Sequence, residues 1–421
     1  MRKTNQISKV LFLFSVCFSS LLLCSLDSQA QFMFNNDSAF KAGTPNSGRL
    51  WGYAFGDLFY KPHSDSLNRG GSNQYTGVAA NTTAFQFRRI YLGYDYNISK
   101  KFIAELLLAA EDDFAGGDIL TNTKFAPYVK YADIRWRDFL FKGNELVFGM
   151  SPTPTFPYLT EYIWNYRSIE RTITDIRRTG SYDFGLSLVG RFFSKDNSTM
   201  WGYNLMVANG QSDKPYSGQY RWFYGDVFLG VLQHRLVFDL YADYDRIHWS
   251  PGFHNARQMT KGYVAWTTPG LTIGVEGYIN NLTQNAVGTH TVGGAKDTLN
   301  QVAQGISFYI HGNIIPDKLR YFARFDSYNP NTKYDNTTYT KYTSFISQYE
   351  PNNKEHFLTA GLDFMPIKNV HFMPNVWYNN YVSQQANQMG KAAKDHDLVW
   401  RMTFYFVFGK TFAWPQNEYY K

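Results

Sequence analysis

The segment Ser151–Gly180 concentrates charged side chains of both signs between two strand-like regions. Its acidic residues are Glu161, Glu170 and Asp175, and its basic residues are Arg167, Arg171, Arg177 and Arg178. Opposed charges around a narrow passage create a transverse field that orients and filters solutes. The functional interpretation is therefore a selectivity constriction, and the alternative is a solvated surface loop with ion pairs of its own.

Further arginines share strand faces with acidic residues. Arg135 lies on the same face of its strand as Asp133, and Arg320 and Arg324 share a face with Asp326, because side chains two positions apart point the same way. Guanidinium groups suit phosphate or carboxylate. Acidic residues would line the same interior, namely Asp239, Asp243 and Asp245. These groups therefore form either an anion path or pairs that neutralise one another across strands, and we expect a weak anion preference or none.

Motifs of known catalytic chemistry are absent from the sequence. It contains no Gly-x-Ser-x-Gly, no His-Glu-x-x-His and no Gly-x-x-x-x-Gly-Lys-Ser/Thr. The nine histidines are widely spaced and predict no metal cluster. No contiguous basic run suggests nucleic-acid binding. The sequence therefore predicts a protein that is not an enzyme, with no cofactor, no metal and no nucleic-acid partner.

The elements that must position these charges alternate with a period of two. Leu236, Phe238 and Leu240 would form one face of a strand, and Val237 and Asp239 the other. The run Leu398–Phe408 likewise separates large apolar side chains from Arg401 and Thr403. A packed core tolerates such charges badly, whereas a water-filled interior accepts them.

The connections between the predicted strands alternate between long and short. We predict sixteen strands, at 49–60, 85–96, 102–111, 126–136, 145–150, 181–192, 200–208, 222–232, 236–245, 259–267, 271–280, 304–314, 318–328, 355–365, 370–379 and 397–409. Long connections include 61–84, 151–180, 281–303 and 329–354, and short ones include 97–101, 233–235, 268–270, 315–317 and 366–369. This pattern predicts an all-β protein, a transmembrane antiparallel β-barrel of about sixteen strands with short periplasmic turns and long extracellular loops. The alternative is a soluble propeller or stack of sandwiches.

Composition supports a barrel over a helical membrane protein. Aromatic residues make up 18% of the chain, and the mean hydropathy is −0.38. Beyond the N-terminus, the sequence has no run of about 20 apolar residues of the kind that a transmembrane helix needs. We interpret the aromatic excess as girdles at the two membrane interfaces and as strand-face residues, rather than as core filler.

The N-terminus has the features of a secretory signal peptide. Arg2, Lys3 and Lys9 precede the apolar stretch 10–23, and Ser28-Gln29-Ala30 suits signal peptidase. We expect residues 1–30 to be removed, together with both cysteines of the chain. The predicted organisation is then a periplasmic N-terminal segment at 31–48, a porin-like barrel at 49–409 and a C-terminal tail at 410–421.

Four segments, in order, resemble the phosphate-selective porins O and P. They are Phe-Gln-Phe-Arg-Arg-Ile-Tyr-Leu-Gly-Tyr at 85–94, Leu-Val-Phe-Gly at 146–149 before a loop with Ile-Glu-Arg at 169–171, Tyr-Phe-Ala-Arg-Phe-Asp at 321–326, and the run 398–408. The resemblance implies a trimeric, sixteen-stranded barrel that passes small anions by diffusion. It places Arg49, Arg88 and Arg89 where the family has a ladder of arginines. The region 256–261 offers only Arg257 and Lys261 for the later part of that ladder.

The phase of the strand at 85–96 separates the two neighbouring arginines. If Ile90, Leu92 and Tyr94 face lipid, Arg89 faces the interior and Arg88 shares the lipid side. Either a β-bulge re-aims one of the two arginines, or the Arg88 side chain extends to the membrane rim.

The leading hypothesis is an outer-membrane porin for small hydrophilic or anionic solutes, embedded in outer-membrane lipid and trimeric by the family resemblance. The alternative is an outer-membrane barrel whose long surface loops bind an extracellular partner, with conduction incidental.

Overall fold

A computed structural model describes residues 44–71, 73–111, 127–177, 180–210, 212, 219–346 and 350–413. The predicted signal peptide at 1–30, most of the segment at 31–48 and the tail from 414 onwards lie outside these residues, so these three predictions stay predictions. No helix in the described ranges is long and apolar enough to cross a membrane.

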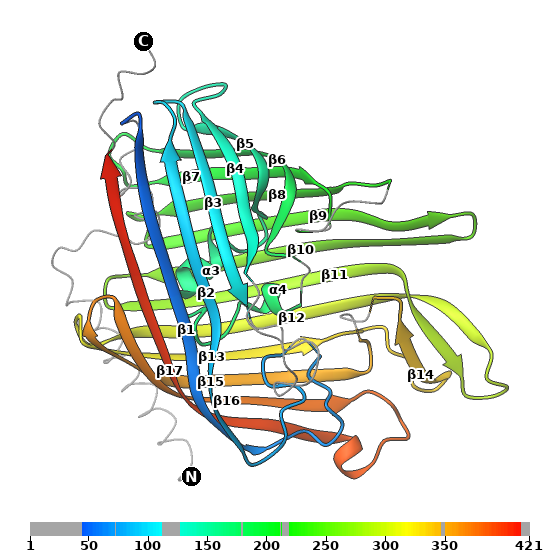
Figure 1. The fold of residues 1–421 in the computed structure, drawn as a ribbon. Coiled ribbons are helices and arrows are strands. Elements are labelled where there is room, and N and C mark those ends of the chain that lie inside the picture. Colours follow the sequence, from blue (N-terminus) through cyan, green and yellow to red (C-terminus); the bar gives the residue numbers. More distant parts are fainter. Residues whose placement is uncertain are drawn as a thin grey trace, which may run out of the picture.

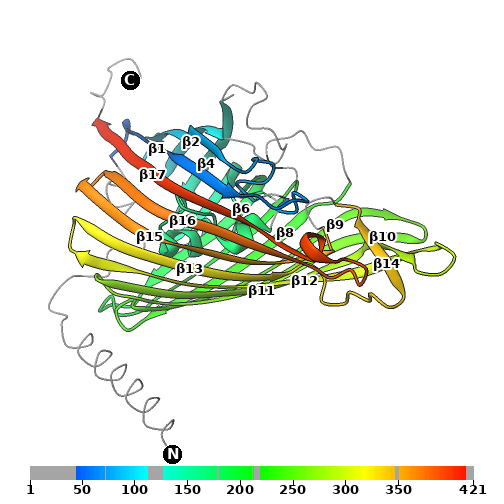
Figure 2. The ribbon, with the colours of Figure 1, turned by 90° about the horizontal axis from the view of Figure 1, so that it is seen from below.

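Sixteen strands close into one antiparallel barrel (Figures 1 and 2). They are β1 (Ser47–His63), β2 (Thr82–Asn97), β3 (Phe102–Glu111), β4 (Tyr128–Arg137), β5 (Asn144–Pro152), β6 (Tyr182–Phe193), β7 (Met200–Ala208), β8 (Trp222–Val231), β9 (Leu236–Ser250), β10 (Phe253–Thr267), β11 (Leu271–His290), β12 (Lys296–Ile315), β13 (Leu319–Asn329), β15 (Asn353–Ile367), β16 (Val370–Ser383) and β17 (Lys394–Ala413). Each predicted strand corresponds to one of them.

Pairing between the first and last strands closes the barrel. β1 pairs with β2 on one side and with β17 on the other, with Gly48 opposite Phe412 and Tyr60 opposite Trp400. All other neighbouring strands of the barrel are consecutive in the sequence, except that β13 pairs with β15. Closure leaves no open sheet edge, which is the condition for strands to span lipid.

The two faces of the wall differ in polarity, as the period-two pattern predicted. On β9, Phe238 and Leu240 are exposed on the outside, whereas Asp239 and Asp243 are buried inside. On β17, Trp400 is exposed and Arg401 is buried. Apolar side chains therefore cover the outer face, and charged side chains line the interior.

Two connections differ from the predicted loops. The segment predicted as a loop at 281–303 is mostly strand, because β11 and β12 continue until a turn at 291–295. β9 and β10 are likewise longer than predicted. Within the predicted loop at 329–354, β14 (Tyr339–Ser344) forms an additional strand that pairs with β11. The two hairpins project beyond the rest of the wall with β14 beside them (Figures 1 and 2).

Many aromatic side chains lie inside the barrel, contrary to the interpretation from composition. Trp164, Trp222 and Trp377 are almost completely buried. Others, such as Trp136 and Trp201, are exposed on the outer face close to the short turns. The aromatic excess therefore serves both the outer face and a packed interior.

Candidate constriction site

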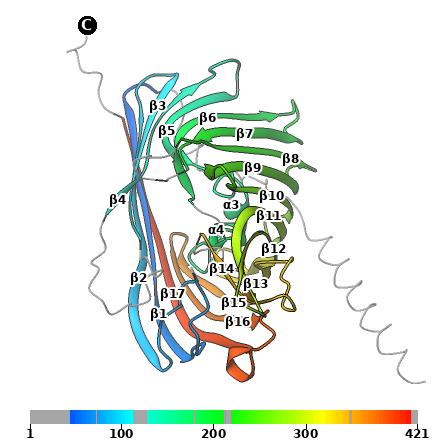
Figure 3. The same cartoon turned by 90° about the vertical axis from the view of Figure 1, so that its right-hand side faces the viewer.

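The connection between β5 and β6 lies inside the barrel over its described residues, 153–177 and 180–181, and we call it the inner loop. It contains α3 (Thr160–Trp164) and α4 (Ile173–Ile176). α3 ends at Asn165, which has a left-handed backbone with φ 57°, and α4 begins at Thr172, whose side chain accepts from the Asp175 N–H. Figure 3 shows both helices within the barrel, with α3 against β11 and α4 against β12. The inner loop is therefore not a solvated surface loop.

Apolar packing attaches the inner loop to one side of the interior. Its buried side chains include Trp164, Tyr166 and Ile169, and they join a cluster with residues of β7–β10, β12, β13 and β16. Ile173 joins a second cluster with side chains from β7 to β13. We call this side, from β7 to β16, the packed wall. Complete burial of one large apolar side chain contributes about 1.5–3 kcal/mol, so several such residues hold the inner loop firmly.

Basic side chains of the wall donate hydrogen bonds to backbone carbonyls of the inner loop. Arg401 donates to Ile169 O at 2.8 Å, and Arg324 donates to Arg171 O at 2.5 Å. Lys261 donates to Thr155 O. These three carbonyls lie in the parts of the inner loop outside α3 and α4. Leaving them without a hydrogen-bond donor inside the barrel would be costly.

His311 forms one further anchor from β12. Arg320 lies 3.1 Å from its Nδ1, and its Nε2 lies 3.0 Å from the Ile163 carbonyl. Because Arg320 can only donate, Nδ1 accepts and the Nε2–H donates, which assigns a neutral imidazole. Arg320 thus orients a residue that holds the inner loop.

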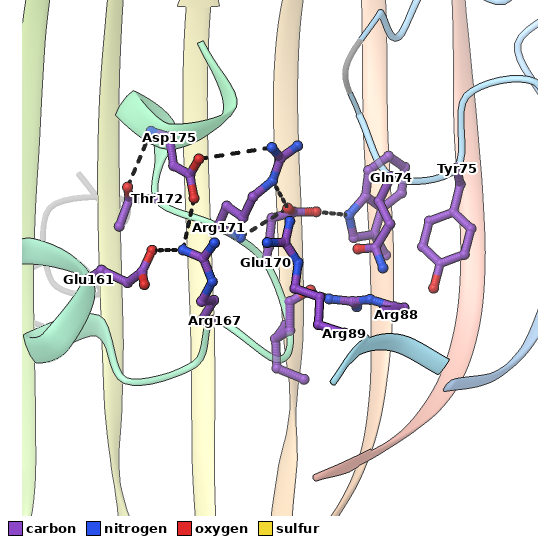
Figure 4. A network of polar contacts seen from close by, with 12 residues as sticks. Gln74, Tyr75, Arg88, Arg89, Glu161, Arg167, Glu170, Arg171, Thr172 and Asp175 are labelled. Atoms are coloured by element: carbon purple, nitrogen blue, oxygen red, sulfur yellow. Dashed lines mark hydrogen bonds and ion pairs between the residues drawn. The ribbon is translucent and has the colours of Figure 1, made fainter. Parts of the chain in front are cut away.

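The charges of the inner loop form a connected network (Figure 4). Arg167 lies between Glu161, with which it pairs, and Asp175, 2.9 Å away. Arg171 is 3.9 Å from both Glu170 and Asp175. Of the remaining constriction candidates, Arg177 pairs with Glu355 of β15 at 2.5 Å, and Arg178 lies outside the described residues.

Glu170 connects this network to the wall. Its Oε2 accepts from the Trp377 indole at 2.8 Å, and its side chain is almost fully buried. Burial alone would raise the pKa of Glu170, but Arg171, Arg88 and the Trp377 hydrogen bond together lower it below its ordinary value. The ionised form of Glu170 is therefore part of the folded arrangement.

The interior face of β1–β4, which we call the open wall, carries ion pairs of a different kind. Arg49 pairs with Asp95 at 2.5 Å, and Glu111 accepts from both Arg89 at 2.8 Å and Lys130 at 2.5 Å. The side chains of Arg49, Arg89 and Glu111 keep 14–19% of their surface exposed. The aromatic cluster of this wall, which includes Tyr91, contains no residue of the inner loop. Partly hydrated charges thus remain on this side.

A β-bulge separates the environments of Arg88 and Arg89. Phe55 pairs with Arg89, while its neighbour Gly56 pairs with Phe87, so Arg88 is the extra residue. Arg88 points inward, is 5% exposed and lies 3.2 Å from Asp57. The bulge, and not extension of Arg88 to the rim, is therefore the correct alternative. Both arginines point into the barrel.

Arg135 and Arg324, both identified in the sequence, also have acidic partners. Arg135 bonds Asp133 at 3.0 Å and pairs with Glu105 of β3. Arg324 pairs with Asp326 at 2.5 Å. Of the two interpretations, these contacts agree with the one in which charges neutralise one another, both across and along strands.

The interior aspartates of β9 also have basic neighbours. Asp239 lies 2.7 Å from Lys261 and Asp245 lies 3.1 Å from Arg257, both on β10. Sequence reasoning missed that four wall residues hold the inner loop, namely Lys261, His311, Trp377 and Arg401. The alternation of side chains along their strands indicated that these residues point into the barrel. It does not indicate which of them contact a loop.

The closed antiparallel barrel matches the fold of solved outer-membrane porins. The chain is similar to the outer membrane channel DcaP of Acinetobacter baumannii, with a TM-score of 0.57 and 10% identity, over 87% of this chain and all of that one. It is also similar to an anion-selective porin from Comamonas acidovorans, with a TM-score of 0.52 and 10% identity, over 86% of this chain and all of that one. A third similar structure is OmpF of Salmonella typhi in complex with daunomycin, with a TM-score of 0.52 and 11% identity, over 86% and 98% of the two chains. No family model and no curated protein sequence matches this chain.

Proposed function

We propose that the protein is an outer-membrane porin that passes small hydrophilic solutes by diffusion, and that the passage runs between the open wall and the inner loop. The observation that carries this proposal is the asymmetric position of the loop. Apolar clusters attach it to the packed wall, while partly exposed ion pairs remain on β1–β4. Solutes would thus pass charged groups on both sides.

We further propose that the anion preference of this passage is weak. Arg49, Arg89, Lys130 and Arg135 face acidic partners on the same wall, and Arg167 lies between two carboxylates. Basic and acidic groups are thus nearly balanced. Arg88 and Arg324, which the sequence placed on the anion path, are buried and bond to inner-loop carbonyls. Arg320 bonds His311, which holds the inner loop. The arginines left for solutes are then Arg49, Arg89 and Arg135, too few to support strong phosphate specificity.

Planar-bilayer recording of the purified, refolded chain tests the porin function. We expect stepwise conductance increments, and a reversal potential close to zero with a small deviation towards anion preference under a KCl gradient. The detergent without protein is the control. If a barrel shown to be folded by its heat-dependent gel mobility gave no steps, the porin proposal would fail, and the alternative of a surface-binding barrel would replace it.

The location and assembly belong to the same proposal. A cleaved leader at 1–30 would deliver the chain to the outer membrane, and the family resemblance implies a homotrimer. Intact mass of the protein from the outer-membrane fraction should correspond to a chain that begins at Gln31, and cross-linking there should give trimers. A chain that kept residues 1–30, or that cross-linked only as a monomer, would refute the corresponding statement.

A further inference from the structure

The barrel seam brings together two histidines that are far apart in the sequence. His63 is the last residue of β1, whereas Asp395 and His396 stand at the beginning of β17. Histidine spacing predicted no metal cluster, because 332 positions separate His63 from Asp395. Closure of the barrel makes them neighbours, since β1 pairs with β17 and His63 lies opposite Leu398.

The three side chains present a compact set of ligand atoms. His63 Nε2 lies 2.8 Å from Asp395 Oδ1, and His396 Nδ1 lies 3.9 Å from the same oxygen. One potential ligand atom from each of the three residues lies within 4.8 Å of the others. The two imidazole rings are stacked, with centroids 4.1 Å apart. A tetrahedral ion with bonds of about 2.0–2.1 Å separates its ligand atoms by about 3.3 Å. His63 Nε2 would therefore move slightly away from Asp395 Oδ1, and His396 Nδ1 slightly towards it. Each histidine side chain keeps 35% of its surface exposed, so both can make that adjustment.

The carboxylate between the histidines is held in place by backbone groups. Asp395 Oδ2 accepts from the Ser66 N–H at 3.0 Å, and Oδ1 accepts from the His396 N–H at 2.9 Å. Its side chain is only 5% exposed. Asp397, two residues further on, is 2.8 Å from Lys61 and therefore neutralised by its own partner. Asp395 thus offers a fixed, nearly buried negative charge beside two accessible nitrogens.

We propose that His63, Asp395 and His396 bind a divalent transition-metal ion, with Zn²⁺ as the representative, and that this ion links β1 to β17. Two imidazoles and one carboxylate suit Zn²⁺, Ni²⁺ or Cu²⁺, whereas Ca²⁺ and Mg²⁺ prefer sets of oxygen ligands. Water would complete the coordination. To bind the ion through Nε2, the His63 ring must carry its proton on Nδ1. Because the ligand forms are neutral imidazoles and a carboxylate, binding weakens at low pH.

The position of the site predicts its effect on the barrel. The β1–β17 pair is the closing junction, and its two strands come from opposite ends of the barrel sequence. An ion that binds the closed barrel and not the unfolded chain stabilises the closed form by mass action. Bound Zn²⁺ is thus expected to delay opening of the seam.

Zn²⁺ binding to the metal-stripped full chain, folded in detergent and free of any polyhistidine tag, tests the proposal. Calorimetry should show one strong site per chain, and His63→Ala and His396→Ala should each weaken it by more than about tenfold. The matched control is His290→Ala. His290 also lies 2.7 Å from an aspartate, Asp297, but these two residues form a pair and not a group of three. The His290→Ala variant should bind Zn²⁺ with the same affinity as the unchanged protein.

The heat-dependent gel mobility of the same samples supplies a second readout and shows that each variant is folded. Zn²⁺ should raise the temperature at which the unchanged protein and His290→Ala lose their compact form, and should leave the two seam variants unaffected. Absence of a strong site in the unchanged protein, or equal affinity in the seam variants, would overturn the proposal. Neither result depends on conductance.

Discussion

The packed wall and the open wall use the same residue types for different purposes. Arg324 of the packed wall and Arg401 of the adjoining β17 are buried, and they donate to carbonyls of the inner loop. On the open wall, Arg49 and Arg89 keep part of their surface exposed and pair with carboxylates of neighbouring strands. An inward-facing arginine is therefore not by itself an anion site. What lies opposite it decides between anchoring a loop and meeting a solute.

The largest effect is expected from Trp164→Ala, which removes the inner-loop side chain that packs against the packed wall. Trp164 is fully buried, packs near Tyr309, and donates through its indole to Glu170 O at 2.8 Å. Truncation of such a side chain costs about 3–5 kcal/mol. We expect the inner loop to detach, with noisier and larger conductance steps and rapid tryptic cleavage at Arg167 or Arg171. Tyr131→Ala on the open wall is the comparison and should leave the inner loop resistant to trypsin.

Arg324→Met should have the next largest effect. The change leaves Asp326 without its 2.5 Å partner and the Arg171 carbonyl without a donor, and breaking a buried pair in this way costs about 3–5 kcal/mol. We expect looser attachment of the inner loop, measured as faster tryptic cleavage, with little change in ion preference. A large shift in reversal potential with an intact loop would instead place Arg324 on the solute path.

Neutralisation of open-wall arginines should change selectivity with little effect on stability. Arg49→Gln combined with Arg89→Gln removes two partly exposed cations, whose pairs contribute about 0–1 kcal/mol each. The reversal potential in a KCl gradient should move towards cation preference, and Glu111→Gln should move it the other way. Unchanged selectivity in both variants would exclude the arginines that the family resemblance places on the anion path.

The smallest effect is expected from acidification. The pKa of Glu170 is below its ordinary value of 4.5, so the stabilisation from its carboxylate is complete above that value. It is lost as the pH falls through the lowered pKa. Conductance noise should therefore stay constant down to about pH 4.5 and rise below it. In Glu170→Gln the noise should be higher at neutral pH and should change less on acidification.

The positions of the strands were more predictable from the sequence than the contacts inside the barrel. Alternation of residues such as Phe238 and Asp239 identifies two faces, because lipid and a polar interior impose opposite requirements on neighbouring positions. The same alternation cannot distinguish a side chain that meets water from one that meets a folded-in loop. Arg324 and Arg401 look like pore residues for that reason. For Arg88 the sequence left two alternatives, a β-bulge or extension to the rim, and the pairing of Phe55 and Gly56 identifies the bulge.

Features that depend on distant parts of the chain were the least predictable. The contact between His63 and His396 arises from closure of the barrel, which the sequence predicts as a topology but not in register. The apolar role of Trp164 and Trp377 depends on where the inner loop packs. The projecting hairpins were missed because residues such as Asn281 and Gln301 are polar and resemble a loop, although outside the lipid a strand needs no apolar face.

The hairpin of β11 and β12 offers a place to modify the protein without touching the passage. Its turn at 291–295 carries Val292 with 87% of its surface exposed, and Gly293 and Gly294 adopt positive φ values with no neighbouring atoms around them. Insertions are best tolerated at such exposed tips. An epitope placed between Gly293 and Gly294 would stand away from the wall, and antibody binding to intact cells would then report surface display separately from conduction.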